Sequence, residues 1–490
     1  MTFHSFTHPG ISKPSFLYFV PDDPYFIRIQ ACILDILYRT YPNSCHIICP
    51  IYGINFFKPK TSSARRYCLD MIADIKANIS LSRAIHHHFL RYSSCYIGGK
   101  KSCRITTVSP LDWSLTLIRQ KDLGGNIDDL LIDTYIRYRP FPVHTVGDEF
   151  WCCLVNRATR YNTLTFQLIQ KFNIKAVFGS YSTYIHHGVP HRVCLKAGIP
   201  TVTFGGNSFS RIHQAESSNP SHVDNYLIYN TNFLEVDRNL LDEARRSLEN
   251  RANGLHDASL PYMKGERKLA KDIDGVKGKV IVYLHDFFDS AHIYRSLLFD
   301  SHYQWAVESI NSLISLGYEF YVKPHPNGIS GSFVVVDSLV NLYSSSPLLK
   351  WLDPDIPNCS IFNLKPSLIV TVYGSVGSEA AYAGIPVLYA GDHPAINFHL
   401  GSTPSTKQEY FSLLANPSFV RLGSKKSALA FVAQHYKSIY LKKDCSLKNF
   451  LGLPWDMLDA NPSLLDTNEA SEYLWAQCSL LIGKLLEHKN

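Results

Sequence analysis

The feature of this 490-residue chain that most constrains its fold is a repeated alternation of short apolar runs with longer stretches of helical periodicity. The apolar runs end at Gly, Ser, Pro or His, and the stretches between them place apolar residues three or four positions apart. Strands that alternate with helices usually pair in parallel, because each helix carries the chain back to the starting edge of the sheet. The pattern therefore predicts an α/β fold with parallel sheets.

In the first half of the chain the pattern predicts helices at 26–41 and 163–172, with strands before and after them. Residues near 58–129 do not follow the alternation, and we expect a partly helical insertion there. The predicted strands of this half are residues 15–20, 46–51, 175–179 and 199–204.

A polar, charge-rich stretch at 263–279 has the composition of an interdomain linker, and the alternation restarts after it. The helices predicted in the second half are 303–316 and 377–383. The predicted strands are residues 280–284, 319–323, 368–372 and 386–389.

A single core seldom organises so long a chain, so we expect two Rossmann-like domains that face each other across a cleft. The first domain comprises residues 1–262 and the second comprises residues 280–400. Residues 401–490 form a C-terminal tail that is mostly helical and ends in an amphipathic run at 472–486.

The composition is that of a globular protein, with 46% hydrophobic and 18% charged residues and a formal net charge of +7. This mild positive charge suits anionic ligands or the surface of an anionic membrane. No block of Lys and Arg typical of a nucleic-acid-binding protein occurs, so we expect no nucleic-acid partner.

The cellular location is predicted from the cysteines and from the first residues of the chain. The twelve cysteines form no CxxC pair, which favours free thiols in a reducing compartment over a zinc site. The N-terminal residues lack the charged and apolar regions of a signal peptide, and no run of 18 apolar residues occurs. We expect a cytoplasmic protein, and its charge is compatible with a peripheral position at the inner membrane.

Four ionisable residues crowd the exit of the predicted strand 280–284, namely His285, Asp286, Asp289 and His292. Ligands of doubly wound sheets bind beyond the carboxyl ends of the strands, so these residues are candidates for substrate contact. The alternative is an ordinary helix cap, but a cap needs one such residue rather than four. We interpret the segment as a ligand-facing loop.

Lys323 and His325 follow the predicted strand 319–323 and alternate with Pro324 and Pro326. Prolines restrict the backbone, and a rigid loop that presents an ammonium group and an imidazole suits a phosphate or pyrophosphate. The alternative is a tight turn in which the imidazole only hydrogen-bonds a neighbouring carbonyl. The residues alone leave both interpretations open.

A turn of small residues at 374–378 follows the third predicted strand of this half and opens a helix. Its glycines, Gly377 included, would let a ligand approach the backbone, and the helix start at Ser375 and Ser378 would offer N–H groups to a phosphate. Glu379 is either an acidic residue favoured by the helix dipole or a carboxylate that accepts hydrogen bonds from ribose hydroxyls. The spacing is neither GxGxxG nor a P-loop, so it does not identify the ligand by itself.

The segments KPHPN and TVYGSVGSEAAYAGIPVLYAG resemble the donor-binding half of bacterial capsule and surface-polysaccharide glycosyltransferases, a group that includes the Kdo transferases. The segments LHDFFDSAH and YSTYIHHGVPHRVCLKAGIPTV resemble parts of related surface-carbohydrate biosynthesis proteins. The resemblance implies the GT-B fold, with an acceptor domain first and a nucleotide-sugar donor domain second. It also implies transfer of a sugar to a glycan or glycolipid acceptor, and a CMP-activated sugar is one candidate donor.

By this resemblance, His325 would contact the donor phosphate, the residues from Ser375 to Ser378 would cradle it, and Glu379 would hold the ribose. We further expect the His325 imidazole to stabilise the charge that grows on the leaving phosphate. The predicted donor-binding residues are Lys323, Ser375, Gly377, Ser378, Glu379 and His285. The predicted substrate-binding residues are Asp286, Asp289, His292 and Arg192.

The N-terminal half is then expected to supply the acceptor site and the catalytic base. His186 and His187 are candidates because an imidazole accepts a proton near neutral pH, although most of the 21 histidines must be structural. Asp22, with Asp23 beside it, is the rival base, and a carboxylate could also act as a nucleophile. Arg192 would pair with an anionic acceptor or cap its own loop.

No metal and no other cofactor are expected, because positive side chains and a helix N-terminus can neutralise a leaving phosphate. Asp353 and Asp355 spell the DxD motif of metal-dependent transferases, but their proline-rich surroundings favour a turn. Two other functions stay open. A nucleotide-sugar 2-epimerase of the same fold would need no acceptor, and a non-catalytic polysaccharide assembly protein would consume no substrate.

Overall fold

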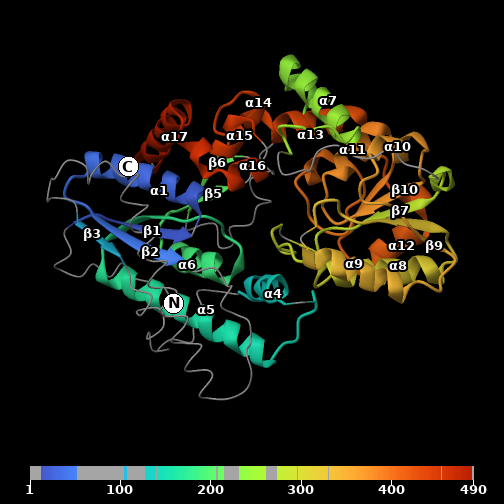
Figure 1. Ribbon diagram of the computed structural model, residues 1–490, viewed down its shortest axis with the longest axis horizontal. Coiled ribbons are helices and arrows are strands. Elements are labelled where there is room, and N and C mark those ends of the chain that lie inside the picture. The colour runs from blue at the N-terminus through green and yellow to red at the C-terminus, as the bar shows by residue number, and fades with distance from the viewer. Residues whose placement is uncertain are drawn as a thin grey trace.

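The computed structural model forms two α/β domains, each built around its own sheet, with helices of the C-terminal segment lying along one side of both (Figure 1). The structure describes residues 13–21, 23–51, 104–107, 127–139, 141–205, 208–214, 231–260, 273–294, 296–328, 330–453 and 455–487. Within these ranges no strand pairing joins the two sheets. The prediction of two Rossmann-like domains of the GT-B type is therefore confirmed.

The N-terminal sheet has the strand order β3-β2-β1-β4-β5-β6, in which only the β5–β6 pair is antiparallel. The central strand β1 is buried on both faces, with Leu17 and Phe19 in one core and Tyr18 and Val20 in the other. This explains why its sequence is apolar at nearly every position. The strands are β1 (Ser15–Pro21), β2 (Cys45–Ile51), β3 (Arg104–Thr107), β4 (Ile174–Phe178), β5 (Thr201–Gly205) and β6 (Ser208–His213).

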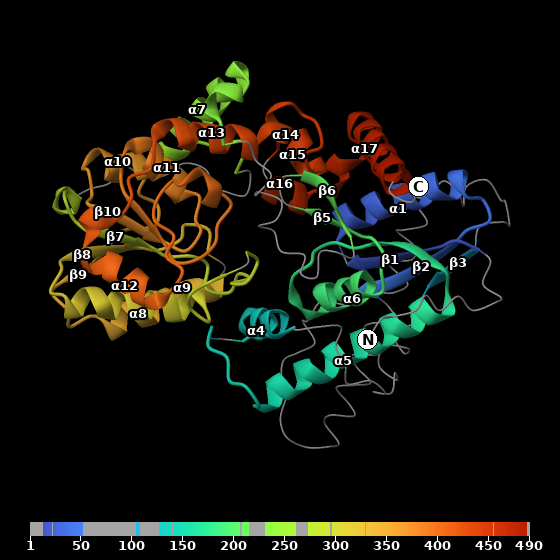
Figure 2. The same cartoon turned by 180° about the vertical axis from the view of Figure 1, so that it is seen from behind.

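Helices cover both faces of this sheet (Figure 2). Helix α1 (Pro24–Thr40) packs on one face together with the last helix of the chain. The other face is covered by α4 (Asp128–Arg137), α5 (Glu149–Lys171) and α6 (Tyr184–Lys196). The predicted helix at 163–172 is therefore the second part of α5, which begins at Glu149.

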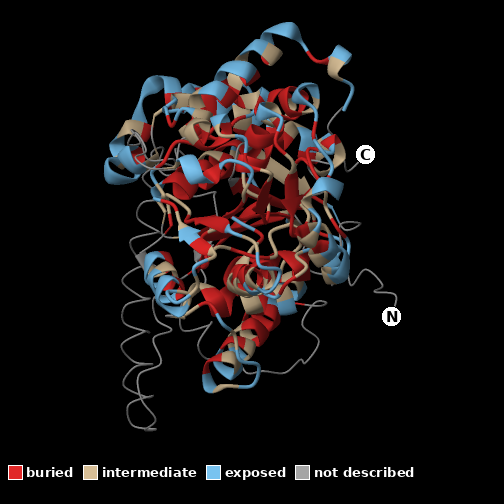
Figure 3. Ribbon diagram, turned by 90° about the vertical axis from the view of Figure 1, so that its right-hand side faces the viewer, coloured by how far each residue is buried: buried red, intermediate tan, exposed pale blue. Residues whose placement is uncertain are grey.

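The C-terminal sheet is entirely parallel, with the order β11-β10-β7-β8-β9, and its strands are buried between helices (Figure 3). Its strands are β7 (Val280–Tyr283), β8 (Phe320–Lys323), β9 (Leu349–Trp351), β10 (Leu368–Thr371) and β11 (Val387–Tyr389). One face packs on α8 (His302–Ser315), α9 (Ser330–Leu342) and α12 (Lys407–Ala415). The other face packs on α10 (Asn358–Asn363) and α11 (Val376–Ala383).

The remaining helices connect the two domains. Helix α7 (Arg238–Ala252) packs against α11 and α13 on the second domain, whereas the last helix, α17, packs against α1 of the first. Arg28 of α1 donates to Asp466, which precedes α17, at 2.6 and 3.0 Å. The tail helices are α13 (Lys425–His435), α14 (Lys437–Tyr440), α15 (Leu447–Leu451), α16 (Trp455–Ala460) and α17 (Asn468–Glu487). Short 3₁₀ helices lie at Phe233–Glu235, Asp274–Val276, Ile396–Phe398, Pro417–Phe419 and Pro462–Asp466.

All eight predicted strands are present, but three further strands were not predicted. Strand β3 lies inside the predicted insertion near 58–129, most of which is outside the described residues. Strands β3 and β9 are edge strands of four and three residues, too short to show a periodic pattern. None of the described helices combines the length and the apolar character needed to cross a lipid bilayer.

Candidate functional site

A cavity of about 500 Å³ lies between the two domains, and residues of both line it. In the second domain it opens beside β7 and β10, two adjacent strands from which the chain continues in opposite directions across the sheet. In the first domain the cavity opens after β4. Strands β1 and β4 are adjacent, and the chain continues from them in opposite directions across that sheet as well. Both places are topological switch points, where doubly wound sheets bind their ligands.

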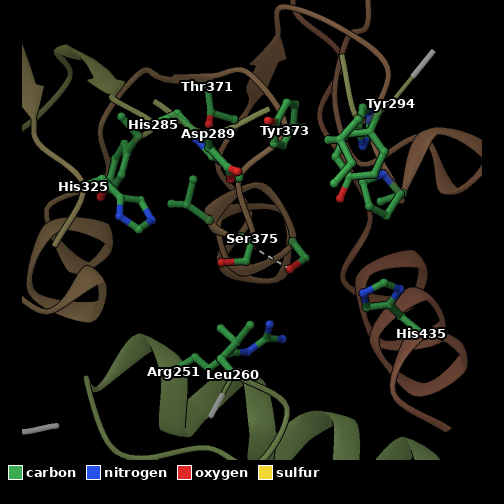
Figure 4. A pocket seen from close by; sticks show the side chains of 18 of the residues that line it. Arg251, Leu260, His285, Asp289, Tyr294, His325, Thr371, Tyr373, Ser375 and His435 are labelled. Carbon is green, nitrogen blue, oxygen red and sulfur yellow. Dashed lines mark hydrogen bonds between the residues drawn. The ribbon is translucent and has the colours of Figure 1, made fainter. Parts of the chain in front are cut away.

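His325 lies in the loop after β8 and lines this cavity, beside His285 (Figure 4). The backbone N–H of Asn327 donates to Nδ1 of His325 at 3.2 Å, and the centres of the His325 and His285 rings are 5.7 Å apart. An imidazole that accepts a hydrogen bond at Nδ1 carries its proton, when neutral, on Nε2. The loop therefore presents an N–H donor of fixed tautomer at the cavity wall.

Lys323 also lines the cavity, but its ammonium group is engaged within the protein. It donates to the carbonyl oxygen of Pro354 at 2.7 Å and lies 5.6 Å from the centre of the Tyr283 ring. The side chain is 1% exposed. The observed contacts fix the loop after β9 against β8, so a structural role accounts for this lysine, and its contact with a donor stays a prediction.

The turn at 374–378 leads into α11 as predicted, and Gly374, Ser375 and Ser378 line the cavity. Ser375 is exposed and occupies the N-cap position without a side-chain capping hydrogen bond. Ser378 Oγ donates to the carbonyl oxygen of Ser375 at 2.8 Å. The start of α11 thus faces the cavity without a side-chain cap at Ser375, and the positive end of its dipole can attract an anion as well as the acidic Glu379 of its first turn.

Gly377 was predicted to let a ligand approach the backbone, but its surroundings indicate a different role. A Cβ atom at this residue would lie 2.0 Å from Oη of the buried Tyr389, and Gly377 is not among the residues that line the cavity. The missing side chain lets α11 pack on β11. Packing, rather than close approach of a ligand, therefore explains this glycine.

Glu379 lines the cavity from the first turn of α11 and is 4% exposed. Its Oε2 atom accepts a hydrogen bond from Nδ2 of Asn358 at 2.7 Å. This contact orients the carboxylate, which has further lone pairs for ligand hydroxyls. The predicted contact with ribose is compatible with this geometry and stays a prediction.

The loop after β7 divides its four ionisable residues between two tasks. His285 and Asp289 line the cavity, whereas Asp286 and His292 are not among the lining residues. Oδ1 of Asp286 accepts from the Ser332 hydroxyl at 2.6 Å and from the Phe288 N–H at 2.9 Å. Asp286 therefore stabilises the loop and ties it to α9, which accounts for its position without a substrate.

His292 forms a contact between the domains. Its Nδ1 lies 2.7 Å from Oδ1 of Asp133 on α4, and its backbone N–H donates to Oδ2 of the same carboxylate at 3.3 Å. Burial lowers the pKa of His292, but the hydrogen bond and the charge of Asp133 outweigh this effect and raise the pKa above its usual value. The imidazolium and the carboxylate thus hold α4 against the loop after β7.

His186 and His187 lie on α6, are 4% and 7% exposed, and do not line the cavity. Burial lowers the pKa of His186 to about 3 and places that of His187 well below its usual value. The His187 Nδ1 atom lies 2.8 Å from Oγ of Ser180. Imidazoles of such low pKa are weak bases, so the structure gives both residues surroundings typical of structural histidines.

Two further candidates of the first domain have structural contacts. Arg192 is 6% exposed, donates to Asp129 at 2.8 Å and ties α6 to α4 away from the cavity lining. Asp23 accepts from the Tyr25 N–H at 2.8 Å and so caps α1. Asp22 lies outside the described residues, and its catalytic role stays a prediction. The residues of this domain that line the cavity include Ser180, Tyr181, Ser182, Thr183, Thr203, Phe204 and Arg211.

Several lining residues were missed at the sequence level. Tyr373 and His393 follow β10 and β11, so the rule that selected the other strand exits would have found them. Nε2 of His393 lies 3.0 Å from the Thr403 hydroxyl. Arg251 and His435 lie on α7 and α13, far from any strand exit, and only the packing of these helices brings them to the cavity.

The DxD sequence forms a turn, as predicted. The backbone N–H of Asp355 donates to Oδ1 of Asp353 at 2.8 Å, which is the bond expected of an Asp that initiates a turn. In the part of the chain that the structure describes, no three His, Cys, Asp or Glu side chains are grouped as ligands of a metal ion.

Two Rossmann-like domains with a cavity between them define the GT-B class of architecture. Neither a protein-family model nor a curated protein matches the chain. Solved structures similar to it include the β-Kdo 2,4-transferase KpsC of Thermosulfurimonas dismutans, with 14% identity and a TM-score of 0.35 over 56% of this chain and 86% of that one.

Two other similar structures are a UDP-GlcNAc 2-epimerase and MurG. The UDP-GlcNAc 2-epimerase of Methanocaldococcus jannaschii, in complex with UDP-GlcNAc and UDP, is 11% identical with a TM-score of 0.27, over 86% of this chain and 98% of that one. MurG of Acinetobacter baumannii is 12% identical with a TM-score of 0.23, over 88% and 99%. The fold class itself rests on the sheet order and the interdomain cavity.

Proposed function

We propose that the chain is a glycosyltransferase that binds a nucleotide-sugar donor in the interdomain cavity and transfers the sugar to a bacterial surface glycan such as capsule or O-antigen. The observation that carries this proposal is that one cavity lies at the switch points of both sheets. Its second-domain wall holds the uncapped start of α11, the His325 imidazole and the Glu379 carboxylate. These are groups that suit a phosphate, its developing charge and a ribose.

In this proposal the two walls have different tasks. The donor phosphate lies at Ser375 and Ser378, and the Nε2–H of His325 donates to it as the bond to the sugar breaks. The hydroxyl-rich wall of the first domain, after β4, receives the glycan or glycolipid acceptor. Asp289, a carboxylate on the cavity wall, is our candidate for the base that accepts the proton of the acceptor hydroxyl, with Asp22 as the rival.

The finer parts of the proposal concern conditions and place. Transfer proceeds without a metal ion, because the helix start and His325 neutralise the leaving phosphate. A CMP-activated sugar is one candidate donor. The protein acts in the cytoplasm at the inner face of the membrane, to which its net charge of +7 would draw it.

The test is incubation of the protein with a panel of UDP-, CDP-, CMP- and GDP-sugars, with and without acceptor glycans, in the presence and absence of EDTA. A glycosyltransferase releases nucleotide only when donor and acceptor are both present, and EDTA leaves the rate unchanged. Interconversion of two nucleotide sugars without any acceptor would instead identify a 2-epimerase. No conversion under any condition would support a non-catalytic assembly protein.

A further inference from the structure

A buried guanidinium lines the α7 side of the cavity, at a residue to which the proposed function assigns no role. Arg251 lies in the last turn of α7 and is 5% exposed. It enters the cavity from the side opposite His285 and Asp289 (Figure 4). Its Nε and Nη2 atoms have no hydrogen-bond partner among the described residues. A buried guanidinium with two unsatisfied nitrogen atoms is costly, so this arrangement needs an explanation.

The carboxylates nearest to Arg251 are engaged elsewhere. Glu379 accepts the hydrogen bond from Asn358 described above, and Asp257 accepts from the Ser247 hydroxyl at 3.0 Å. Both carboxylates influence the guanidinium through their charge, but neither forms an ion pair with it in the described ranges. A structural ion pair therefore does not account for Arg251.

The surroundings of Arg251 favour an anion. Arg211 of β6 and His435 of α13 line the same cavity. Burial, and after it the charges of Arg211 and Arg251, lower the pKa of His435 to about 3, so this imidazole is neutral. The Arg251 guanidinium lies 5.5 Å from the centre of the Tyr436 ring, and this stacking helps to fix its direction. The guanidiniums of Arg251 and Arg211 thus line this part of the cavity together with the carboxylates of Asp257 and Glu379.

We propose that Arg251 binds an oxyanion, a phosphate or a carboxylate group, of the substrate held in the cavity. The inference rests on the proposed function only in taking that substrate to be a nucleotide sugar. A planar guanidinium matches two oxygens of such a group at once. Because α7 packs against α11, the anion lies between Arg251 and the start of α11 and is held from two sides.

The experiment compares Arg251→Met and Arg251→Lys with Arg246→Met, a matched control on the same helix whose arginine is exposed and paired with Glu243. The probe is inorganic pyrophosphate, and its affinity is measured by calorimetry together with the melting temperature without ligand. Arg251→Met should lower the affinity at least tenfold, because a charged hydrogen bond contributes about 1.5–3 kcal/mol. Its melting temperature should be unchanged or higher, because an uncompensated buried charge is removed. Arg251→Lys should lose part of the affinity and Arg246→Met none.

Pyrophosphate affinity within twofold of the wild type in folded Arg251→Met, or no binding by the wild type, overturns the inference.

The affinities for CMP and CMP-Kdo show which group of the substrate Arg251 binds. If Arg251→Met loses affinity equally for CMP and for CMP-Kdo, the oxyanion is a phosphate. If it loses affinity for CMP-Kdo alone, the oxyanion is the carboxylate of the sugar. If pyrophosphate binding depends on Arg251 but no nucleotide sugar is consumed, the proposed function fails and the anion site stands. If the wild type transfers sugar and Arg251→Met binds pyrophosphate normally, the anion site fails and the function stands.

Discussion

Both domains carry histidines in the segment that follows a strand, but the histidines of the two domains have different surroundings. In the second domain, His325 follows the end of β8 by two residues and lines the cavity. In the first domain, β4 ends at Phe178, and His186 and His187 come only after the chain has entered α6. They point into the domain, are buried and are held neutral.

The comparison shows that the number of histidines does not identify the site, because the histidine in the loop after β8 lines the cavity and the two histidines on α6 do not. A residue within the loop that leaves a parallel strand must lie at the sheet edge, where ligands bind. A residue a turn into the following helix is directed by the helix, and α6 packs most of its surface against α4 and α5. Each of the two prolines disfavours helical geometry at the residue before it, so Lys323 and His325 stay outside a helix.

The largest expected effect is that of His325→Ala on turnover. Loss of a donor to the charge on the leaving phosphate should lower turnover about 100-fold, with a smaller effect on donor affinity. His325→Gln should keep part of the activity, because the amide can still donate a hydrogen bond. Turnover and melting temperature are measured on the same preparation, and near-normal turnover in folded His325→Ala would defeat the assignment.

Glu379→Ala should weaken nucleotide binding by about 1–3 kcal/mol, because charged hydrogen bonds to the ribose hydroxyls would be lost. Calorimetry with the nucleotide measures this loss. Glu319→Ala is the control, since Glu319 is exposed at the far end of β8 and pairs with Lys279. If Glu379→Ala binds the nucleotide with unaltered affinity, Glu379 does not bind the ribose, and its contact with Asn358 and its position at the helix start are its only roles.

His187→Ala should destabilise the protein without changing the turnover of the folded fraction. The substitution leaves a buried Ser180 hydroxyl without its partner, which costs about 1–3 kcal/mol in the free energy of unfolding. Chemical denaturation measures the cost. A large fall in turnover at unchanged stability would instead show that His187 takes part in catalysis. The histidines of the two domains would then not differ in role.

The smallest effect concerns pH and the contact of His292 with Asp133. Because the folded-state pKa of His292 is raised, the imidazolium contributes stability that is fully present below the unfolded pKa of about 6.5 and is lost as the pH rises through the raised value. The free energies of unfolding of wild type and His292→Gln should therefore differ by about 1 kcal/mol at mildly acidic pH, above the raised pKa of the Asp133 carboxyl, and converge as the pH rises through the raised pKa of His292; melting temperatures measured against pH follow this difference. A difference that grows with pH would contradict the protonated pair.

The sequence predicts the fold well where the strands are buried on both faces. The apolar runs that became β1, β4, β7 and β10 are continuous because helices cover both sides of each sheet. The edge strands β3 and β9 were not predicted, because so few residues show no periodic pattern of apolar side chains. Strand β6 is antiparallel and does not follow the alternation of strands and helices.

The site is predictable only where it is local in sequence. His325 and Ser375 lie in loops that follow strands, Glu379 lies in the first turn of the helix after β10, and the structure brings all three to one cavity. Gly377 was predicted in a turn but lies in the first turn of α11, and the reason for a glycine there is the Tyr389 hydroxyl on β11, which no local pattern shows. Arg251 reaches the cavity only because α7 packs across to the second domain. Tertiary packing of this kind leaves no signal in a single sequence.

The position of the donor can be measured in a structure of the protein with a bound nucleotide sugar. We expect the nucleotide in the interdomain cavity, with phosphate oxygens at hydrogen-bond distance, about 3 Å, from the start of α11 and from Nε2 of His325. We also expect ribose hydroxyls on Glu379 and a sugar that faces the wall after β4. A nucleotide bound outside this cavity, or with its phosphate away from both Ser375 and His325, would show that the proposed donor site is wrong.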